Sequence, residues 1–326
     1  MSGTFVVGET KIRPGVYTRR ENAGGVEIAG AVNGIGAAVI RANWGPLNKI
    51  VWIESPVDAA AAFGLPGTGH TVNIIDEMLT GGASKVAAVR AGSGGTAATI
   101  TLKDTTGSPV NVVTITAKYP GARPFSVTIR DSLADANKRE CIIYSGTSEF
   151  EKVTFAKGAT GDGEPAAIVA ALANSANFTA TKVADGTKAL AAVSSTAFTA
   201  GTDPAVTSAE YSSALNVLEA AAWNVLIVDT SDTAVHALVA AFIDRIYEAG
   251  SNSIAVIAEP KTVALATRMQ NAAAFNDEKI VFPLNSAYDA SGTLYDGYLL
   301  AARIGGMVAA VPSNQSLTHE VVSGMV

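Results

Sequence analysis

The sequence predicts an α/β protein, α+β overall, in which a mostly parallel, doubly wound-like α/β domain is split by an inserted β-rich domain. Near both ends of the chain, apolar strand patterns alternate with amphipathic helix patterns, as in parallel α/β sheets. This alternation stops at Gly92 and resumes after Gly201, and the residues between are rich in threonine with period-two patterning. We therefore expect an extended N-terminal arm at 1–25, an α/β core domain at 26–91 with 201–326, and an inserted β-rich domain at 92–200.

The first α/β segment contains a well-marked helix start at Ser55. Serine can cap a helix, Pro56 suits the first helical position, and an acidic Asp58 suits the first turn. The expected elements here are strands at 35–46, 49–55 and 85–92, with a further helix at 71–80.

The second α/β segment opens with a capping box, in which Thr207 and Glu210 can satisfy each other's backbone donors. A continuous apolar run at 224–229 is typical of a central parallel strand. Repeated strand–helix–strand units predict right-handed crossovers. The remaining expected elements are a helix starting at Asp232 or Thr233, helices at 262–275 and 296–309, and strands at 253–260 and 279–283.

The inserted segment reads as a series of short strands separated by turn residues. One helix pattern, from Pro165 to about Asn174, interrupts them. The expected strands are 96–104, 111–119, 124–132, 139–146, 150–158 and 177–183.

Composition excludes several classes of function. The net charge of −6 is unusual for a nucleic-acid-binding protein, so we expect no nucleic-acid partner. The single cysteine, Cys141, excludes an intramolecular disulfide and a cysteine-based zinc site. No run of about 18 apolar residues occurs, and we expect no membrane insertion. With 48% hydrophobic and only 16% charged residues, the composition favours self-association.

Two glycine-rich stretches resemble ligand loops but lack the required context. GLPGTGHT at 64–71 has His70 where a phosphate loop has lysine, and a helix pattern precedes it, which favours a helix-to-helix turn. GSGG at 92–95 is followed by strand patterns rather than by a helix, which favours a hinge between domains.

The stretch DTSDT at 229–233 leaves two interpretations open. It follows a central strand, where α/β sheets place ligands, and its oxygen-bearing side chains suit a hard cation. Alternatively, Asp232 or Thr233 caps the next helix. A doubly wound enzyme or metal-binding module with a site near Asp229 is therefore the alternative function. His236 is expected at the surface or boundary of a helix, and no nucleophile–base arrangement is suggested.

The order of several stretches along the chain resembles the tail sheath proteins of contractile phage tails. Related particles with such sheaths include R-type bacteriocins and defective prophages. The stretches are RPGVYTRREN, GGASKVAAVRAG, the threonine-rich insertion, NVLIVDTSD, AFNDEKIVFP and AARIGGMVAAVPSNQSLTHEVV.

The resemblance implies a structural subunit, not an enzyme, that has no cofactor. Such subunits polymerise as stacked rings around an inner tube and contract to drive that tube through a target cell envelope, which permits viral genome ejection. The implied partners are copies of the chain itself, the inner tail tube protein, and the baseplate and tail terminator proteins. The implied location is the virion tail, assembled in the bacterial host cytoplasm.

The resemblance also implies that terminal arms join neighbouring subunits by adding strands to their sheets. Pro14 and Gly15 should mark a bend, because proline cannot donate a ladder hydrogen bond. The arm residues expected to contact another subunit are Phe5, Val7, Ile12, Arg13, Pro14, Gly15, Val16 and Tyr17. Sheath chains of this kind usually continue beyond SLTHEVVSG, so we expect a further C-terminal domain and arm to be absent here.

Overall fold

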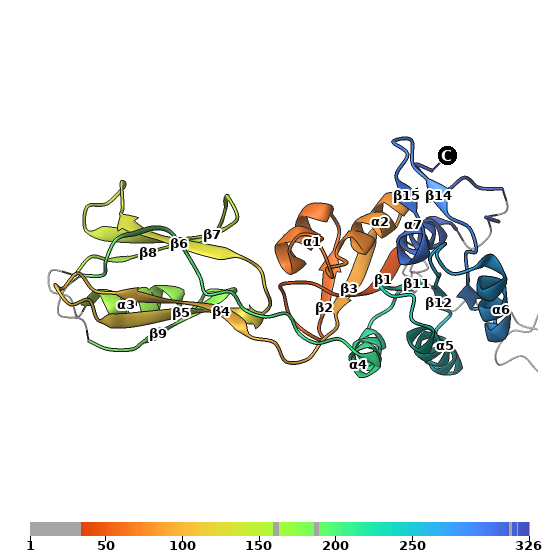
Figure 1. The fold of residues 1–326 in the computed structure, drawn as a ribbon, viewed down its shortest axis with the longest axis horizontal. Coiled ribbons are helices and arrows are strands. Elements are labelled where there is room, and N and C mark those ends of the chain that lie inside the picture. The colour runs from red at the N-terminus through yellow and green to blue at the C-terminus, as the bar shows by residue number, and fades with distance from the viewer. Residues whose placement is uncertain (1–33, 159–162, 186–188, 313–314, 318, 326) are drawn as a thin grey trace, which may run out of the picture.

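A six-stranded sheet forms the centre of one half of the structure (Figure 1). The computed structural model describes residues 34–158, 163–185, 189–312, 315–317 and 319–325. The sheet has the order β13-β12-β11-β1-β3-β2, with β2 antiparallel to β3 and the other pairs parallel. Its strands are β1 (Ile35–Ile40), β2 (Ile50–Ile53), β3 (Lys85–Arg90), β11 (Val225–Val228), β12 (Ile254–Val256) and β13 (Ile280–Val281).

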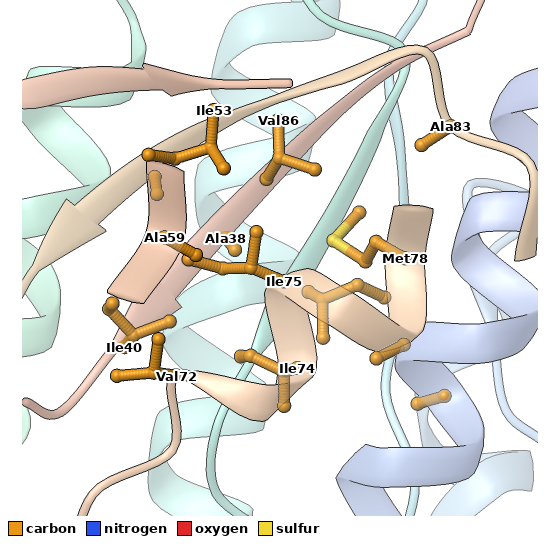
Figure 2. Packing of buried hydrophobic residues seen from close by; sticks show 14 of the residues in the cluster. Ala38, Ile40, Ile53, Ala59, Val72, Ile74, Ile75, Met78, Ala83 and Val86 are labelled. Carbon is orange, nitrogen blue, oxygen red and sulfur yellow. The ribbon is translucent and has the colours of Figure 1, made fainter. Parts of the chain in front are cut away.

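Helices pack against both faces of this sheet. We call the sheet together with these helices the α/β unit. Alternate residues of a strand point to opposite faces. Ala38 and Ile40 of β1 therefore pack on one side with α1 (Pro56–Phe63), α2 (Asn73–Gly81) and α7 (Gly297–Ala310). Figure 2 shows Ile74, Ile75 and Met78 of α2 in this cluster. On the other side, Ala37 and Val39 pack with α4 (Ser208–Leu218) and α5 (Thr233–Glu248).

The predicted helix starts are confirmed. The Ser55 side chain accepts a hydrogen bond from the backbone N of Asp58 at 3.2 Å, with Pro56 at the first position of α1. The capping box of Thr207 and Glu210 is formed at α4. Each signal is local in sequence, because a cap needs only the residues of one helical turn.

Glycines let α2 and α7 approach closely. A Cβ on Gly81 would lie 2.2 Å from the carbonyl oxygen of Arg303, and one on Gly306 would lie 2.0 Å from that of Met78. Real Cβ atoms do not occupy such positions, so this crossing needs glycine on both helices.

Residues between β3 and α4 form a second unit, the β-rich unit, which lies end to end with the α/β unit in Figure 1. One sheet has the order β10-β6-β7-β8 and the other β4-β5-β9, with antiparallel pairing throughout. Buried residues of both sheets and of α3 (Gly163–Leu172) share a single core. The strands are β4 (Ala97–Lys103), β5 (Asn111–Pro120), β6 (Phe125–Asp131), β7 (Lys138–Ser145), β8 (Ser148–Ala156), β9 (Phe178–Lys182) and β10 (Val193–Ala197).

The mixed α/β character is confirmed, with several sheets and seven helices among the described residues. The remaining elements are α6 (Leu265–Phe275) and a small hairpin of β14 (Ala287–Tyr288) and β15 (Leu294–Tyr295). None of the helices in the described part of the chain has the length and hydropathy needed to cross a bilayer.

Candidate functional site

The Asp229 carboxylate lies fully buried at the carboxyl end of β11. Its Oδ2 accepts hydrogen bonds from the Arg41 backbone N at 2.9 Å, from Arg41 Nε at 2.8 Å, and from Thr71 Oγ1 at 2.5 Å. Its Oδ1 accepts from the hydroxyl of Tyr211. One side chain thereby holds together the end of β1, the residues before α2, and helix α4.

Burial and the neighbouring Asp229 carboxylate raise the pKa of Tyr211, so this phenol stays protonated and remains a donor. Although burial alone would lower it, the pKa of Arg41 is also raised, because its guanidinium faces Asp229. The Asp229 carboxylate is therefore surrounded by the neutral phenol of Tyr211 and the permanently charged guanidinium of Arg41. This arrangement is typical of a structural ion pair.

The capping interpretation of residues 229–233 is confirmed. The Asp232 side chain accepts a hydrogen bond from the Ala234 backbone N at 2.8 Å and so caps α5. Ser231 Oγ donates to the Ala258 carbonyl at 3.1 Å. With both Asp229 oxygens already accepting hydrogen bonds, and no cluster of three ligating side chains among the residues described, nothing favours a cation or catalytic site here.

A second buried network lies where the α/β unit meets the β-rich unit, and Trp44 is at its centre. Trp44 follows β1 of the α/β unit, yet its indole is only 2% exposed and belongs to the core of the β-rich unit. Its ring centroid lies 5.1 Å from that of Tyr119 and 5.9 Å from that of Phe150, both in edge-on orientation.

Arg90, at the end of β3, ties backbone carbonyls of both units together. It donates to the carbonyl oxygens of Ala42 at 2.9 Å, Gly45 at 2.8 Å and Pro120 at 2.8 Å. Burial lowers the pKa of Arg90 to about 10, which still leaves the guanidinium charged at neutral pH. Within the described part of the chain the hydrogen-bond partners of Arg90 are backbone carbonyls, whose dipoles stabilise the buried cation.

Gly121 allows the two units to touch backbone to backbone. Its φ is +151°, and a Cβ at this position would lie 1.9 Å from the carbonyl oxygen of Asn43. That same oxygen accepts a hydrogen bond from the Arg123 backbone N at 3.2 Å. The segment after β1 and the segment after β5 are therefore in direct contact.

The two chain segments that connect the units also pair with each other. Ser93 pairs with Ala205 and Thr96 with Thr202 in antiparallel bridges. Ser93 Oγ also donates to Glu210 Oε1 of α4 at 2.7 Å. The glycine-rich residues 92–95 thus lie between the units, as the hinge interpretation expected, but the connection is a hydrogen-bonded two-stranded ribbon.

We call the contacts of Trp44, Arg90, Gly121 and the paired connecting segments the junction. One local signal for the junction is Arg90, a charged residue that directly follows the apolar stretch VAAV of β3. The partners of that arginine come from residues distant in the chain and could not be inferred.

The predicted arm contacts cannot be placed, because they lie outside the described residues. This applies to Phe5, Val7, Ile12, Arg13, Pro14, Gly15, Val16 and Tyr17. His236, expected at a surface or boundary, is instead 1% exposed, so that expectation was wrong. Helical periodicity placed it beside the core stripe, but Phe282, which follows β13, closes over its ring.

Comparison with known proteins identifies the family. Residues 93–203 match the β-sandwich domain of phage tail sheath proteins, and residues 204–326 match their central domain. No curated protein matched the sequence.

Two solved structures share the fold. A sheath tail protein from Desulfitobacterium hafniense superposes with a TM-score of 0.68 at 23% identity, over 96% of this chain and 66% of the other. A sheath tail protein from Listeria innocua superposes with a TM-score of 0.68 at 22% identity. The match covers 90% of this chain and 60% of the other. The chain spans less than two thirds of the length of either. With its two matched domains in consecutive order, the chain belongs to the phage tail sheath protein family.

Proposed function

We propose that this protein is the structural subunit of a contractile phage tail sheath. In this proposal it polymerises as stacked rings around an inner tube, and its contraction drives that tube through a target cell envelope during genome ejection. The observation that carries the proposal is the junction, whose buried contacts join the α/β unit to the β-rich unit, the part of the chain that matches the family's β-sandwich domain. A subunit that transmits force needs such a connection, because a loose linker would absorb the movement.

The proposal includes no catalysis and no cofactor. The Asp229 site is occupied by structural hydrogen bonds, so nothing supports the enzyme alternative. Stored conformational energy would supply the work of contraction. The family match likewise supports a structural role.

The proposed partners are copies of the chain, the inner tail tube protein, and the baseplate and tail terminator proteins. The proposed location is the virion tail, with assembly in the bacterial host cytoplasm. The same subunit would serve in a phage, a defective prophage particle or an R-type bacteriocin. Neither a nucleic acid nor direct membrane insertion enters the proposal.

The domain organisation that accompanies this function is also a proposal. Residues 1–25 form an inter-subunit arm, 26–91 with 201–326 form a doubly wound α/β core, and 92–200 form the insertion. Helical layers on both faces of the sheet support the doubly wound description. The two-sheet core supports the insertion.

Electron microscopy of the full natural chain tests the function. Negatively stained protein at high concentration should show rings or tubes. A matched sample lacking residues 1–20 should keep its melting temperature and lose the polymers. Monodisperse single subunits from the full natural chain under every condition that keeps it folded would contradict the proposal.

A further inference from the structure

A cleft of about 1160 Å³ lies beside the junction, between the α/β unit and the β7–β8 turn of the β-rich unit. Its volume exceeds the roughly 300–1000 Å³ of most small-molecule sites, so it has room for a segment of protein chain. Its apolar wall on the α/β unit includes Trp52, Val57 and Leu65, which are 45%, 76% and 68% exposed. Three large exposed apolar side chains around one cleft are typical of a protein–protein interface.

The cleft also contains Arg123, a half-buried cation with donors to spare. Its Nε donates to Ser145 Oγ at 2.9 Å, whereas Nη1 lies 3.4 Å from the carbonyl oxygens of Ala60 and Ala61 of α1, a long distance for a hydrogen bond. Burial lowers the pKa of Arg123, and no carboxylate among the residues that the structure describes offsets this shift. A guanidinium beside an apolar wall favours an occupant that brings both an apolar side chain and a carboxylate.

One segment of this chain combines these two groups, the loop between β6 and β7. Leu133 in this loop is 91% exposed, more than any other large apolar side chain in the described part of the chain, and Asp135 follows two positions later. Backbone hydrogen bonds from Ser132 N to the Lys138 carbonyl and from Lys138 N to the Asp135 carbonyl, both at 3.0 Å, hold the loop. The loop therefore presents Leu133 in a fixed position, and docking costs little conformational freedom.

The spacing of the two groups in the loop matches the cleft. Val57 and Ala61, whose carbonyl oxygen faces Arg123, are about one helical turn apart on α1, which is about 6 Å along the helix axis. Leu133 and Asp135 are two residues apart, which allows at most about 7 Å between their Cα atoms. Leu133 can therefore contact Val57 while the Asp135 carboxylate pairs with Arg123.

The loop cannot enter the cleft of its own chain. Arg123 and Pro124 of the cleft directly precede β6, and the loop follows the other end of this seven-residue strand, about 20 Å away. We propose that the β6–β7 loop of one copy docks into the cleft of a second copy, with Leu133 on the apolar wall and Asp135 at Arg123. Two different surfaces meet in this contact, so it repeats from copy to copy as a ring or a helix. The inference rests on the proposed function, for which a repeating contact of this kind is needed.

Disulfide cross-linking of the full natural chain tests the contact. Leu133→Cys and Val57→Cys are made as separate variants, mixed under assembly conditions and mildly oxidised, and the cross-linked peptides are identified by mass spectrometry. The matched control is a mixture of Leu133→Cys with Leu265→Cys, because Leu265 is exposed on α6 and does not line the cleft. We expect the disulfide between positions 133 and 57 at a yield at least about tenfold above that of the control.

Electron microscopy of the same samples separates this inference from the proposed function. Equal yields in the two mixtures, in samples that contain polymers, would overturn the docking of the loop and leave the proposed function intact. Absence of both polymers and the cross-link would overturn both.

Sedimentation velocity measures what each group contributes to association, with circular dichroism to confirm that the variants are folded. Leu133→Asn should raise the concentration needed for self-association by about tenfold or more, because the apolar contact is lost. Asp135→Asn should raise it by about threefold or more, although its amide oxygen can still accept the hydrogen bond from Asn137 N that shapes the loop. Asp185→Asn, at a side chain 74% exposed in the same unit, should change it by less than about twofold. Unchanged association of Leu133→Asn would overturn the docking, and unchanged association of Asp135→Asn would overturn the pairing with Arg123.

Discussion

The indole of Trp44 and the phenyl ring of Phe125 lie 5.0 Å apart between centroids, at an interplanar angle of 73°. Trp44 follows the first strand of the α/β unit, and Phe125 begins β6 of the β-rich unit. The core of one unit is therefore completed by a side chain that belongs to the other. Unfolding either unit exposes this indole or removes its surroundings, which couples the stability of the two units.

Replacing Trp44 should uncouple the units. Trp44→Ala leaves a large cavity in the core of the β-rich unit, and we expect a loss of about 3–5 kcal/mol in the free energy of unfolding. We also expect one unfolding transition to become two, followed by circular dichroism in urea. Trp52→Ala is the control, because Trp52 is 45% exposed, and it should cost less than about 1 kcal/mol. A single unchanged transition in Trp44→Ala would contradict the coupling.

Arg90→Lys keeps the charge but cannot reproduce the three carbonyl contacts. Because buried carbonyls would lose their donor, we expect a loss of about 2–4 kcal/mol in the free energy of unfolding. Arg130→Lys offers a matched comparison, since the Arg130 side chain is 48% exposed and pairs with Glu140. That change should cost less than about 1 kcal/mol in the same urea titration. Equal costs would show that the junction bonds of Arg90 contribute little.

Gly121 should tolerate no side chain. Gly121→Ala places a Cβ against the Asn43 carbonyl, so the two units must separate locally, and we expect a loss of about 3 kcal/mol or more. Gly146 also has a positive φ, of +64°, but no heavy atom lies within 4 Å of its Cβ position. Gly146→Ala should therefore cost only the conformational strain of about 1–2 kcal/mol. Thermal melts of both variants measure the difference, and a smaller loss at Gly121 than at Gly146 would refute it.

His236 should make stability fall in mild acid. Burial lowers the pKa of this ring below its ordinary value of 6.5 in the folded protein. As the pH falls through 6.5, the unfolded chain binds a proton that the folded chain does not, so the stability present at neutral pH is progressively lost below that pH. Urea titrations at several pH values should show a shallower pH dependence for His236→Gln. An identical pH dependence of the free energy of unfolding in His236→Gln would show that other groups cause the loss of stability in acid.

Local signals in the sequence predicted much of the fold. Ser55 and Thr207 were identified as helix caps, and Asp232 as one of two candidates with Thr233, because capping depends on neighbours within one turn. The strand β10 (Val193–Ala197) was missed. Its residues are mostly exposed, it lacks an alternating pattern, and its pairing with β6 is irregular.

The junction could not be predicted, since its contacts join residues far apart in the chain. Nothing local in the sequence indicates which core Trp44 enters. Asp229 was correctly placed at the end of a central strand. Its partners Arg41, Thr71 and Tyr211 come from three other segments, and they decide that the carboxylate is structural.

The junction should make the two units move as one body. Spin labels at Thr147→Cys, in the turn after β7, and Glu248→Cys, at the end of α5, would report the distance between the units by pulsed electron resonance. Both positions are exposed. Cys141 should stay unlabelled, because it is 1% exposed and burial raises the pKa of its thiol to about 12. We predict a single narrow distance distribution that broadens in Trp44→Ala. A broad or bimodal distribution in the protein with Trp44 intact would contradict the claim.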